Sequence, residues 1–172
     1  PGGLRMRLVE GAADVDDVGA FVERLDAVGA RHGVTVQAFD ARYVVSRAHL
    51  ERAVELAERA FERGANVAHD RGVEILLYAA GRRQIDRALT MGVSPGEQSV
   101  VVLVDAGDDD GAAEDEAAAA VERELRPAST LGAFDEGRVR EYFDVGAREL
   151  AVVDGCLADV VLERVALLDV EK

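Results

Sequence analysis

The sequence predicts a single compact α/β domain in which a mixed sheet is flanked by helices. Its 172 residues are 49% hydrophobic, which is enough apolar material for one buried core. Short apolar runs of strand length alternate with amphipathic segments of helix length along the chain. Neither an internal repeat nor a Gly- or Pro-rich linker divides the sequence, so one domain is the simplest interpretation.

The first 64 residues contain two predicted strands and two predicted helices. The strands are short apolar or alternating segments, and each helix repeats apolar residues every three to four positions after an Asp or Ser that can cap it. The strands are Leu4–Glu10 and Val34–Phe39, and the helices run from Asp14 or Asp16 to about Val28 and from the cap Ser46 to Gly64.

The middle of the chain predicts a strand, a helix and a second strand. Val73 to Ala79 is a compact apolar run that indicates a buried strand, with the extension of a helix as the competing interpretation. After Gly81, the pattern of Arg82 to Met91 is typical of a short helix, and Val100 to Val104 predicts another buried strand. This order fits a right-handed crossover unit.

The last third is predicted to be helical after an acidic insertion. Asp105 to Glu116 is interpreted as a solvated acidic loop, followed by an Ala-rich helix over about Ala112 to Leu125. Another helix is expected from Asp135 through Phe143, with a short one ending at Val153. The C-terminal segment, Leu157 to Val170, is apolar on nearly every side, so its own fold or a partner must bury it.

The charge of the chain is strongly negative but unevenly distributed. The formal charge is −14, and 19 of the 20 cations are Arg. Between Arg42 and Arg87, nine Arg face seven Asp and Glu, which gives +2 there and −16 in the remainder. Abundant acid with almost no Lys is typical of a protein from a halophilic archaeon, where acidic surfaces stay hydrated in a high-salt cytoplasm. We therefore expect function in the segment that departs from this pattern.

Few residues are suited to catalysis, metal binding or a cofactor. The sequence lacks a GxxxxGK[ST] loop, a Gly-rich dinucleotide turn and an HExxH motif. Cys156 has no His near it in sequence, and His32, His49 and His69 are far apart. We predict no catalytic residue, no metal site and no cofactor. No apolar stretch reaches 18 residues, so we expect no membrane contact and a cytoplasmic location.

One segment, residues 74–93, stands out chemically. A Gly turn precedes a predicted helix with cations in its first turn, where they oppose the helix dipole and therefore suggest an anionic ligand. Its polar residues are Arg82, Arg83, Gln84 and Arg87, and the apolar residues Ile85 and Leu89 are expected to anchor it to the core. Solvated Arg side chains balanced by Asp86 are the competing interpretation.

Three sequence blocks carry a resemblance to a known family. They are Glu74-Ile-Leu-Leu-Tyr-Ala-Ala-Gly-Arg-Arg-Gln-Ile-Asp-Arg-Ala-Leu89 with Gly92-Val93 and Ser99–Val104, the upstream Phe39-Asp40-Ala41 and His49-Leu50-Glu51-Arg52-Ala53, and the downstream Val160–Leu168. Together they resemble the small kinase-binding subunit of the KEOPS complex, whose eukaryotic counterpart is the PRPK-binding protein. The acidic insertion matches nothing in that family.

The resemblance implies a non-catalytic subunit of the machinery that makes threonylcarbamoyladenosine in tRNA. Members of the family bind and regulate the small atypical kinase/ATPase of KEOPS, help to engage tRNA at its 3′ CCA end, and reach the other KEOPS subunits indirectly. From the sequence we expect tRNA phosphate to be contacted by Arg82, Arg83, Gln84 and Arg87, and bases to stack on Tyr78 or His49. The implied kinase-binding residues are Val161, Leu162, Val165, Leu167 and Leu168.

Each of these assignments has a structural alternative. Tyr78 ends an apolar run, which favours a position in the core, and His49 lies in the first turn of a helix, where it can hydrogen-bond locally. Leu162 and Leu167 can be buried by the Ala-rich helix instead of by a kinase. Two other functions also stay open: a small metal-dependent enzyme that uses the acidic-loop carboxylates, and an adaptor whose Arg cluster binds an acidic protein.

Overall fold

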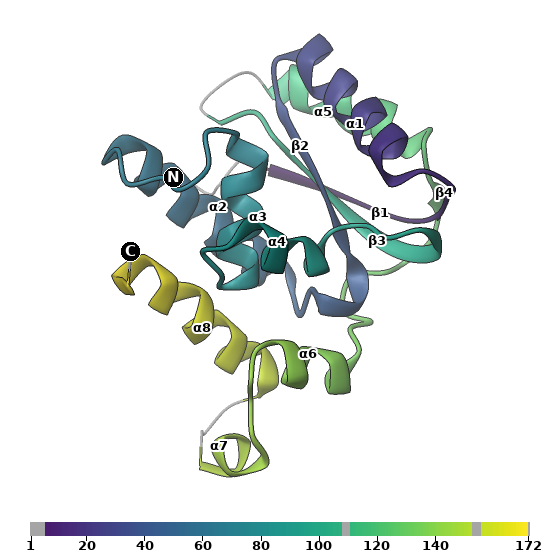
Figure 1. Cartoon of the computed structure of the whole chain (residues 1–172). Coiled ribbons are helices and arrows are strands. Elements are labelled where there is room, and N and C mark those ends of the chain that lie inside the picture. The colour runs from purple at the N-terminus through teal and green to yellow at the C-terminus, as the bar shows by residue number, and fades with distance from the viewer. Residues whose placement is uncertain (1–5, 108–110, 153–155, 172) are drawn as a thin grey trace. The chain divides into compact units, whose positions relative to one another are not determined.

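A computed structural model describes residues 6–107, 111–152 and 156–171, and it confirms the α/β class (Figure 1). The chain folds into two compact units. The sheet unit comprises Pro1–Ala41 and Gly92–Thr130, and the helical unit comprises Arg42–Met91 and Leu131–Lys172. The organisation as a single domain stays a prediction. Within the described ranges, no helix is both long and apolar enough to cross a membrane.

The sheet is antiparallel in every pairing of the described strands, which corrects the expected mixed sheet. Its strands are β1 (Met6–Val15), β2 (Thr35–Asp40), β3 (Gly96–Asp105) and β4 (Arg126–Pro127), in the order β2-β3-β1-β4. The ten residues of β1 pair along their whole length with β3, so that Met6 lies opposite Asp105. The two residues of β4 pair only with Gly11 and Ala12 of β1. Leu4, where the first strand is predicted to begin, lies outside the described residues.

Two helices, α1 (Val18–His32) and α5 (Gly111–Glu122), contact each other and pack on one face of this sheet. Their shared core includes Phe21, Leu25, Val100, Val102, Val104, Ala117 and Val121. The cap of α1 is Asp17, whose side chain accepts from the N–H of Ala20 at 3.1 Å. The sequence predicts Asp14 or Asp16 as this cap, but β1 extends to Val15 and thereby delays the start of the helix.

The acidic insertion is only partly a loop. Helix α5 begins at Gly111, so that the second half of the predicted loop is helical. Glu114 is buried there, and its carboxylate accepts from the N–H of Ala106 at 3.3 Å, closing the turn after β3. Asp108, Asp109 and Asp110 lie outside the described residues.

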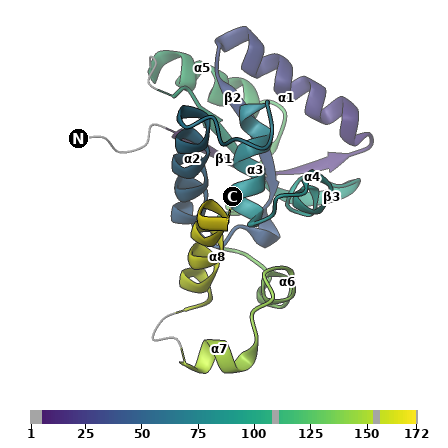
Figure 2. The same ribbon diagram turned by 60° about the vertical axis from the view of Figure 1, so that its left-hand side comes forward.

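The helical unit is built from helices and short turns. Its elements are the 3₁₀ turn η1 (Ala41–Tyr43, shared with the sheet unit), α2 (Arg47–Glu62), α3 (Arg71–Ala80), α4 (Ile85–Ala88), η2 (Leu89–Met91), α6 (Glu136–Tyr142), α7 (Ala147–Val152) and α8 (Leu157–Glu171). Helix α2 packs against α3, and α8 contacts both of them (Figure 2). Ser46 caps α2 as predicted, accepting from the N–H of His49 at 3.2 Å.

The apolar run of residues 73–79 is helical, which corrects the predicted strand and removes the crossover unit. It forms α3, which is capped by Asp70 and ends at Gly81 with φ 63°. Eight of its ten residues are buried. A helix that is buried around most of its circumference carries apolar side chains on nearly every side, so a window as short as residues 73–79 cannot be told from a buried strand.

Candidate functional site

The end of α3 fixes the position of Arg82. Gly81 adopts a left-handed conformation, its N–H donates to the Tyr78 carbonyl at 3.0 Å, and the N–H of Arg82 donates to the Leu77 carbonyl at 3.0 Å. These two bonds form a Schellman motif, which ends the helix and directs the chain sharply away from it. Arg82 therefore begins at a rigid corner, and the glycine is needed there for its positive φ.

The predicted helix after this corner is shorter than expected. Helix α4 contains only Ile85–Ala88, and Arg82 and Arg83 precede it instead of occupying its first turn. Gln84 is the N-cap residue but makes no side-chain capping bond. The expected placement of Arg82 and Arg83 in the first turn of a helix is therefore wrong, and so short a helix presents little dipole to an anion.

The side chain of Arg82 is held against Tyr142 at the end of α6. The centre of its guanidinium lies 4.7 Å from the centroid of the Tyr142 ring, and its Nη2 donates to the backbone carbonyl of Tyr142. The Tyr142 hydroxyl in turn donates to the carbonyl of Arg87 at 2.8 Å. Burial raises the pKa of Tyr142 from its usual value, although the cation of Arg82 opposes this shift. Tyr142 thus bonds to the side chain of Arg82 and to the carbonyl of Arg87, and it connects both ends of residues 82–87 to α6.

Two pockets of the helical unit share the Arg82–Tyr142 pair as a wall. The larger pocket, of about 400 Å³, is lined by Tyr43, Arg82, Thr90, Arg138, Glu141 and Tyr142. The smaller one, of about 210 Å³, is lined by Ala80, Gly81, Arg82, Tyr142, Phe143, Asp144, Arg164, Leu167 and Leu168. Tyr43 meets Tyr142 edge to face with ring centroids 5.4 Å apart. Aromatic faces and guanidinium groups therefore line the same hollow, a combination that suits a flat anionic ligand.

The rest of the Arg segment is open to solvent. Arg83, Gln84 and Arg87 are exposed, as a binding role requires. Ile85 and Leu89 are 44% and 55% exposed, so the expectation that they anchor the segment in the core is wrong. The segment is anchored by Ala88 and Met91 instead. Its surface is thus both cationic and apolar.

His49 is an internal residue of the helical unit and does not reach the surface. It is completely buried, its Nε2 lies 2.7 Å from the carbonyl oxygen of Ala79, and its Nδ1 accepts from the N–H of Val45 at 3.3 Å. Both ring nitrogens are used, which requires the neutral tautomer with the proton on Nε2. Burial lowers the pKa of His49 from 6.5 to about 4. The suggested stacking of His49 on RNA is therefore not compatible with its position.

Tyr78 is likewise buried, which favours the core interpretation over stacking on a base. Its hydroxyl donates to Asp169 of α8 at 3.1 Å, and the same carboxylate accepts from Arg63 at 2.7 Å. Burial raises the pKa of Tyr78, and the hydrogen bond to Asp169 adds to that effect. Tyr78 thus connects α3 to α8 inside the helical unit.

The expected kinase-binding face of α8 is divided between core and surface. Three of its residues are buried, namely Val161, Val165 and Leu168. Within the helical unit, α8 packs on α2 and α3. Leu162 is half-buried, whereas Leu167 is 46% exposed and lines the smaller pocket. Burial by its own unit explains most of the apolar character of this helix. Among the five residues expected to bind the kinase, Leu167 is the most exposed.

Sequence reasoning missed the aromatic side of the site, Tyr43 and Tyr142, together with Arg138. The one usable signal is composition, since the chain has only three Tyr and one of them adjoins Phe143 in a predicted helix. Their proximity to Arg82 depends on tertiary structure. Within the described ranges, no group of three or more His, Cys, Asp or Glu is arranged to hold a metal ion.

A comparison with protein families agrees with the resemblance that the three sequence blocks indicate. The family model of the kinase binding protein CGI-121 matches residues 13–169, which is nearly the whole chain. The chain belongs to the CGI-121 family. No curated protein matches the chain in a comparison of sequences. The corner at Gly81, α6 and all of α8 up to Asp169 fall within the matched range, and so do the Arg82–Tyr142 pair and Leu167.

Proposed function

We propose that this CGI-121 family member is a non-catalytic accessory subunit of the KEOPS complex, which binds and regulates the small atypical kinase/ATPase and helps to dock tRNA by its 3′ CCA end. The observation that carries the tRNA role is the Arg82–Tyr142 wall between two pockets, flanked by exposed Arg83, Gln84 and Arg87. Single-stranded nucleotides are held by guanidinium contacts to phosphate and by stacking on aromatic faces.

The structure changes which residues we assign to tRNA. Tyr142 and Tyr43 replace Tyr78 and His49 as the aromatic groups, because Tyr142 and Tyr43 line a pocket whereas Tyr78 and His49 are completely buried. Arg82 has a structural role as well, since it holds α6 in place. Exposed Arg83 and Arg87 are therefore the cleaner residues for testing tRNA binding.

A double substitution of these two residues tests the tRNA role. Arg83→Ala/Arg87→Ala should weaken tRNA binding by about tenfold, since each lost phosphate contact costs up to about 1 kcal/mol in salt. The matched control is Arg31→Ala/Arg123→Ala, which removes two exposed Arg of the sheet unit. Fluorescence anisotropy with labelled tRNA measures both variants. Equal weakening by the control would show that only net charge matters, and unchanged binding by the test variant would refute the assignment.

Leu167 is the residue of α8 that we assign to the kinase. Leu167→Asp places a charge on a side chain that is already 46% exposed, so the fold should survive. We expect at least a tenfold loss of affinity for the kinase subunit, the cost typical of an apolar interface anchor. Val22→Asp on α1, where Val22 is 38% exposed, is the control. Co-purification that survives Leu167→Asp would exclude this face of α8.

A protein-binding adaptor is the second candidate function, favoured by the exposed Ile85 and Leu89 beside the Arg residues. An acidic, partly apolar protein surface would complement such a segment. This alternative predicts no tRNA binding at all, whereas Ile85→Asp would abolish capture of the protein partner.

A further inference from the structure

The sheet unit has an open strand edge that the proposed function does not use. Strand β1 is paired with β3 along all ten of its residues, but on its other side only Gly11 and Ala12 meet β4. Arg7, Leu8 and Val9 therefore lie along a stretch of edge where no described strand is paired. An exposed strand edge is a template for another extended chain, which proteins usually cover or shorten.

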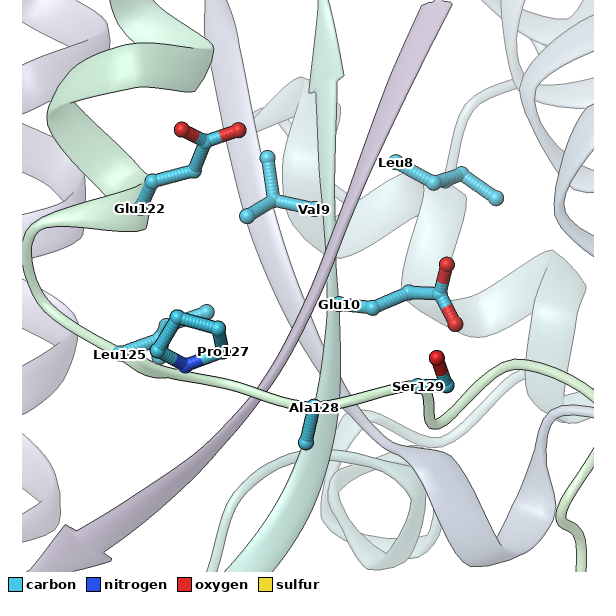
Figure 3. A pocket seen from close by; sticks show the side chains of 8 residues that line it. All are labelled: Leu8, Val9, Glu10, Glu122, Leu125, Pro127, Ala128 and Ser129. Carbon is cyan, nitrogen blue, oxygen red and sulfur yellow. The ribbon is translucent and has the colours of Figure 1, made fainter.

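A pocket of about 650 Å³ runs along this edge (Figure 3). Its lining consists of Leu8, Val9, Glu10, Glu122, Leu125, Pro127, Ala128 and Ser129. Figure 3 shows Val9 and Glu122 on one side of the β1 strand, with Leu8 and Glu10 on the other. Since the pocket takes residues from both faces of β1, it follows the edge of the sheet and does not lie on one face. This shape fits an added strand better than a compact molecule.

The described residues that line this pocket include two carboxylates and no cation, and the nearby Arg7 is paired with Asp115. Glu122 is exposed near the end of α5, and Glu10 is exposed on β1, where its carboxylate accepts from the N–H of Thr130 at 2.9 Å. The sheet unit contains six Arg against 17 Asp and Glu, which is a formal charge of −11. An incoming chain that complements this edge is therefore cationic. A second copy of this protein would bring another charge of −11 to the same edge.

The two carboxylates define a spacing in the incoming chain. Successive residues of a strand point to opposite faces of a sheet. A strand added beside β1 therefore presents one side chain to Glu122 and the next one to Glu10. We propose that the β1 edge binds an extended segment of a partner protein that carries two consecutive basic residues with apolar neighbours, by β-strand addition.

Two peptides of the same composition test the spacing. The first is acetyl-Thr-Val-Arg-Arg-Val-Thr-amide, and the second is acetyl-Thr-Arg-Val-Arg-Val-Thr-amide, in which the two Arg point to the same face. Titration of the full chain by calorimetry should show at least threefold tighter binding of the first peptide. Backbone amide signals of residues 7–10 should shift in NMR spectra during the titration. Equal affinities, or shifts confined to other segments, would overturn the proposal.

Substitutions at the edge separate local contacts from net charge. Glu10→Gln/Glu122→Gln removes both charges but keeps an oxygen that accepts from Thr130, and it should weaken peptide binding about tenfold. Asp14→Asn/Glu23→Gln makes the same charge change at exposed residues outside the pocket lining and should change affinity less than twofold. Ala128→Phe fills the pocket without a charge change and should abolish binding.

Each remaining outcome also decides the question. Equal loss in the two charge variants would show attraction by bulk charge alone, and full binding by Ala128→Phe would exclude this pocket. Light scattering that reveals a dimer of the wild-type chain, converted to a monomer by Ala128→Phe, would assign the edge to a second copy instead. The melting temperature of each variant, unchanged from that of the wild type, verifies that the fold is intact.

Discussion

Acidification should destabilise this protein through His49. In the folded state both of its nitrogens are engaged inside the helical unit, and burial lowers its pKa from 6.5 to about 4. Protonation of Nδ1 would bury a cation and leave the N–H of Val45 facing another donor. The unfolded chain has no such restriction, so its His49 takes up a proton near pH 6.5.

The sign and size of the effect follow from the two pKa values. The folded-state pKa is the lower one, so the stabilisation is fully present above pH 6.5 and is lost as the pH falls towards 4. In that window the unfolded state binds more protons than the folded state. Between pH 7 and pH 4.5 the loss from this single residue is about 2 kcal/mol.

The assay is urea unfolding at constant salt, with the free energy of unfolding measured from pH 7 to pH 4.5. Many carboxylates also titrate in this range, so the wild type is compared at every pH with His49→Gln, which has similar hydrogen-bonding groups but no titrating ring. The stability advantage of the wild type over the variant should shrink by about 2 kcal/mol across the window. An advantage that stays constant with pH would refute the burial argument.

Three further substitutions test the packing, each through the free energy of urea unfolding. Arg82→Ala should lower the free energy of unfolding by about 1–2 kcal/mol, because it removes both the cation–π contact with Tyr142 and a charged hydrogen bond. Arg82→Lys should recover part of this loss. An unchanged stability of Arg82→Ala would mean that Arg82 does not hold α6. Gly29→Ala should lower the free energy of unfolding by about 1–3 kcal/mol, because a Cβ there would lie 2.7 Å from the carbonyl oxygen of Val34. An unchanged stability would show that the turn after α1 shifts to make room at little energetic cost. Glu74→Ala should cost about 3 kcal/mol by orphaning two loop N–H groups that its buried carboxylate binds at 2.9 and 3.1 Å, and Glu74→Gln should cost clearly less.

The parts of the fold that sequence predicts well are those fixed by local chemistry. Ser46 and Asp135 cap their helices as expected. A capping bond involves residues only three or four positions apart, so the sequence contains both partners. The continuous apolar run Val100–Val104 is a strand for the same reason, since β-branched residues dominate it.

The errors occur where tertiary structure decides. Residues 73–79 form a helix because other parts of the chain bury nearly all of its surface, which a short window of sequence does not reveal. The Gly-Arg-Arg motif indicates Arg82, but Tyr142 lies 60 residues further along and meets it only in the folded chain. The interior positions of His49 and Tyr78 likewise depend on distant partners, the carbonyl of Ala79 and the carboxylate of Asp169.

A titration of the full chain with intact tRNA and with the same tRNA lacking its 3′ CCA end tests the central claim most directly. The proposal predicts that removal of the CCA nucleotides weakens binding by at least tenfold, because the stacking and phosphate contacts at the Arg82–Tyr142 wall are lost together. Equal binding of the two tRNAs, or no binding of either, would contradict the proposal that this CGI-121 family protein docks the tRNA end.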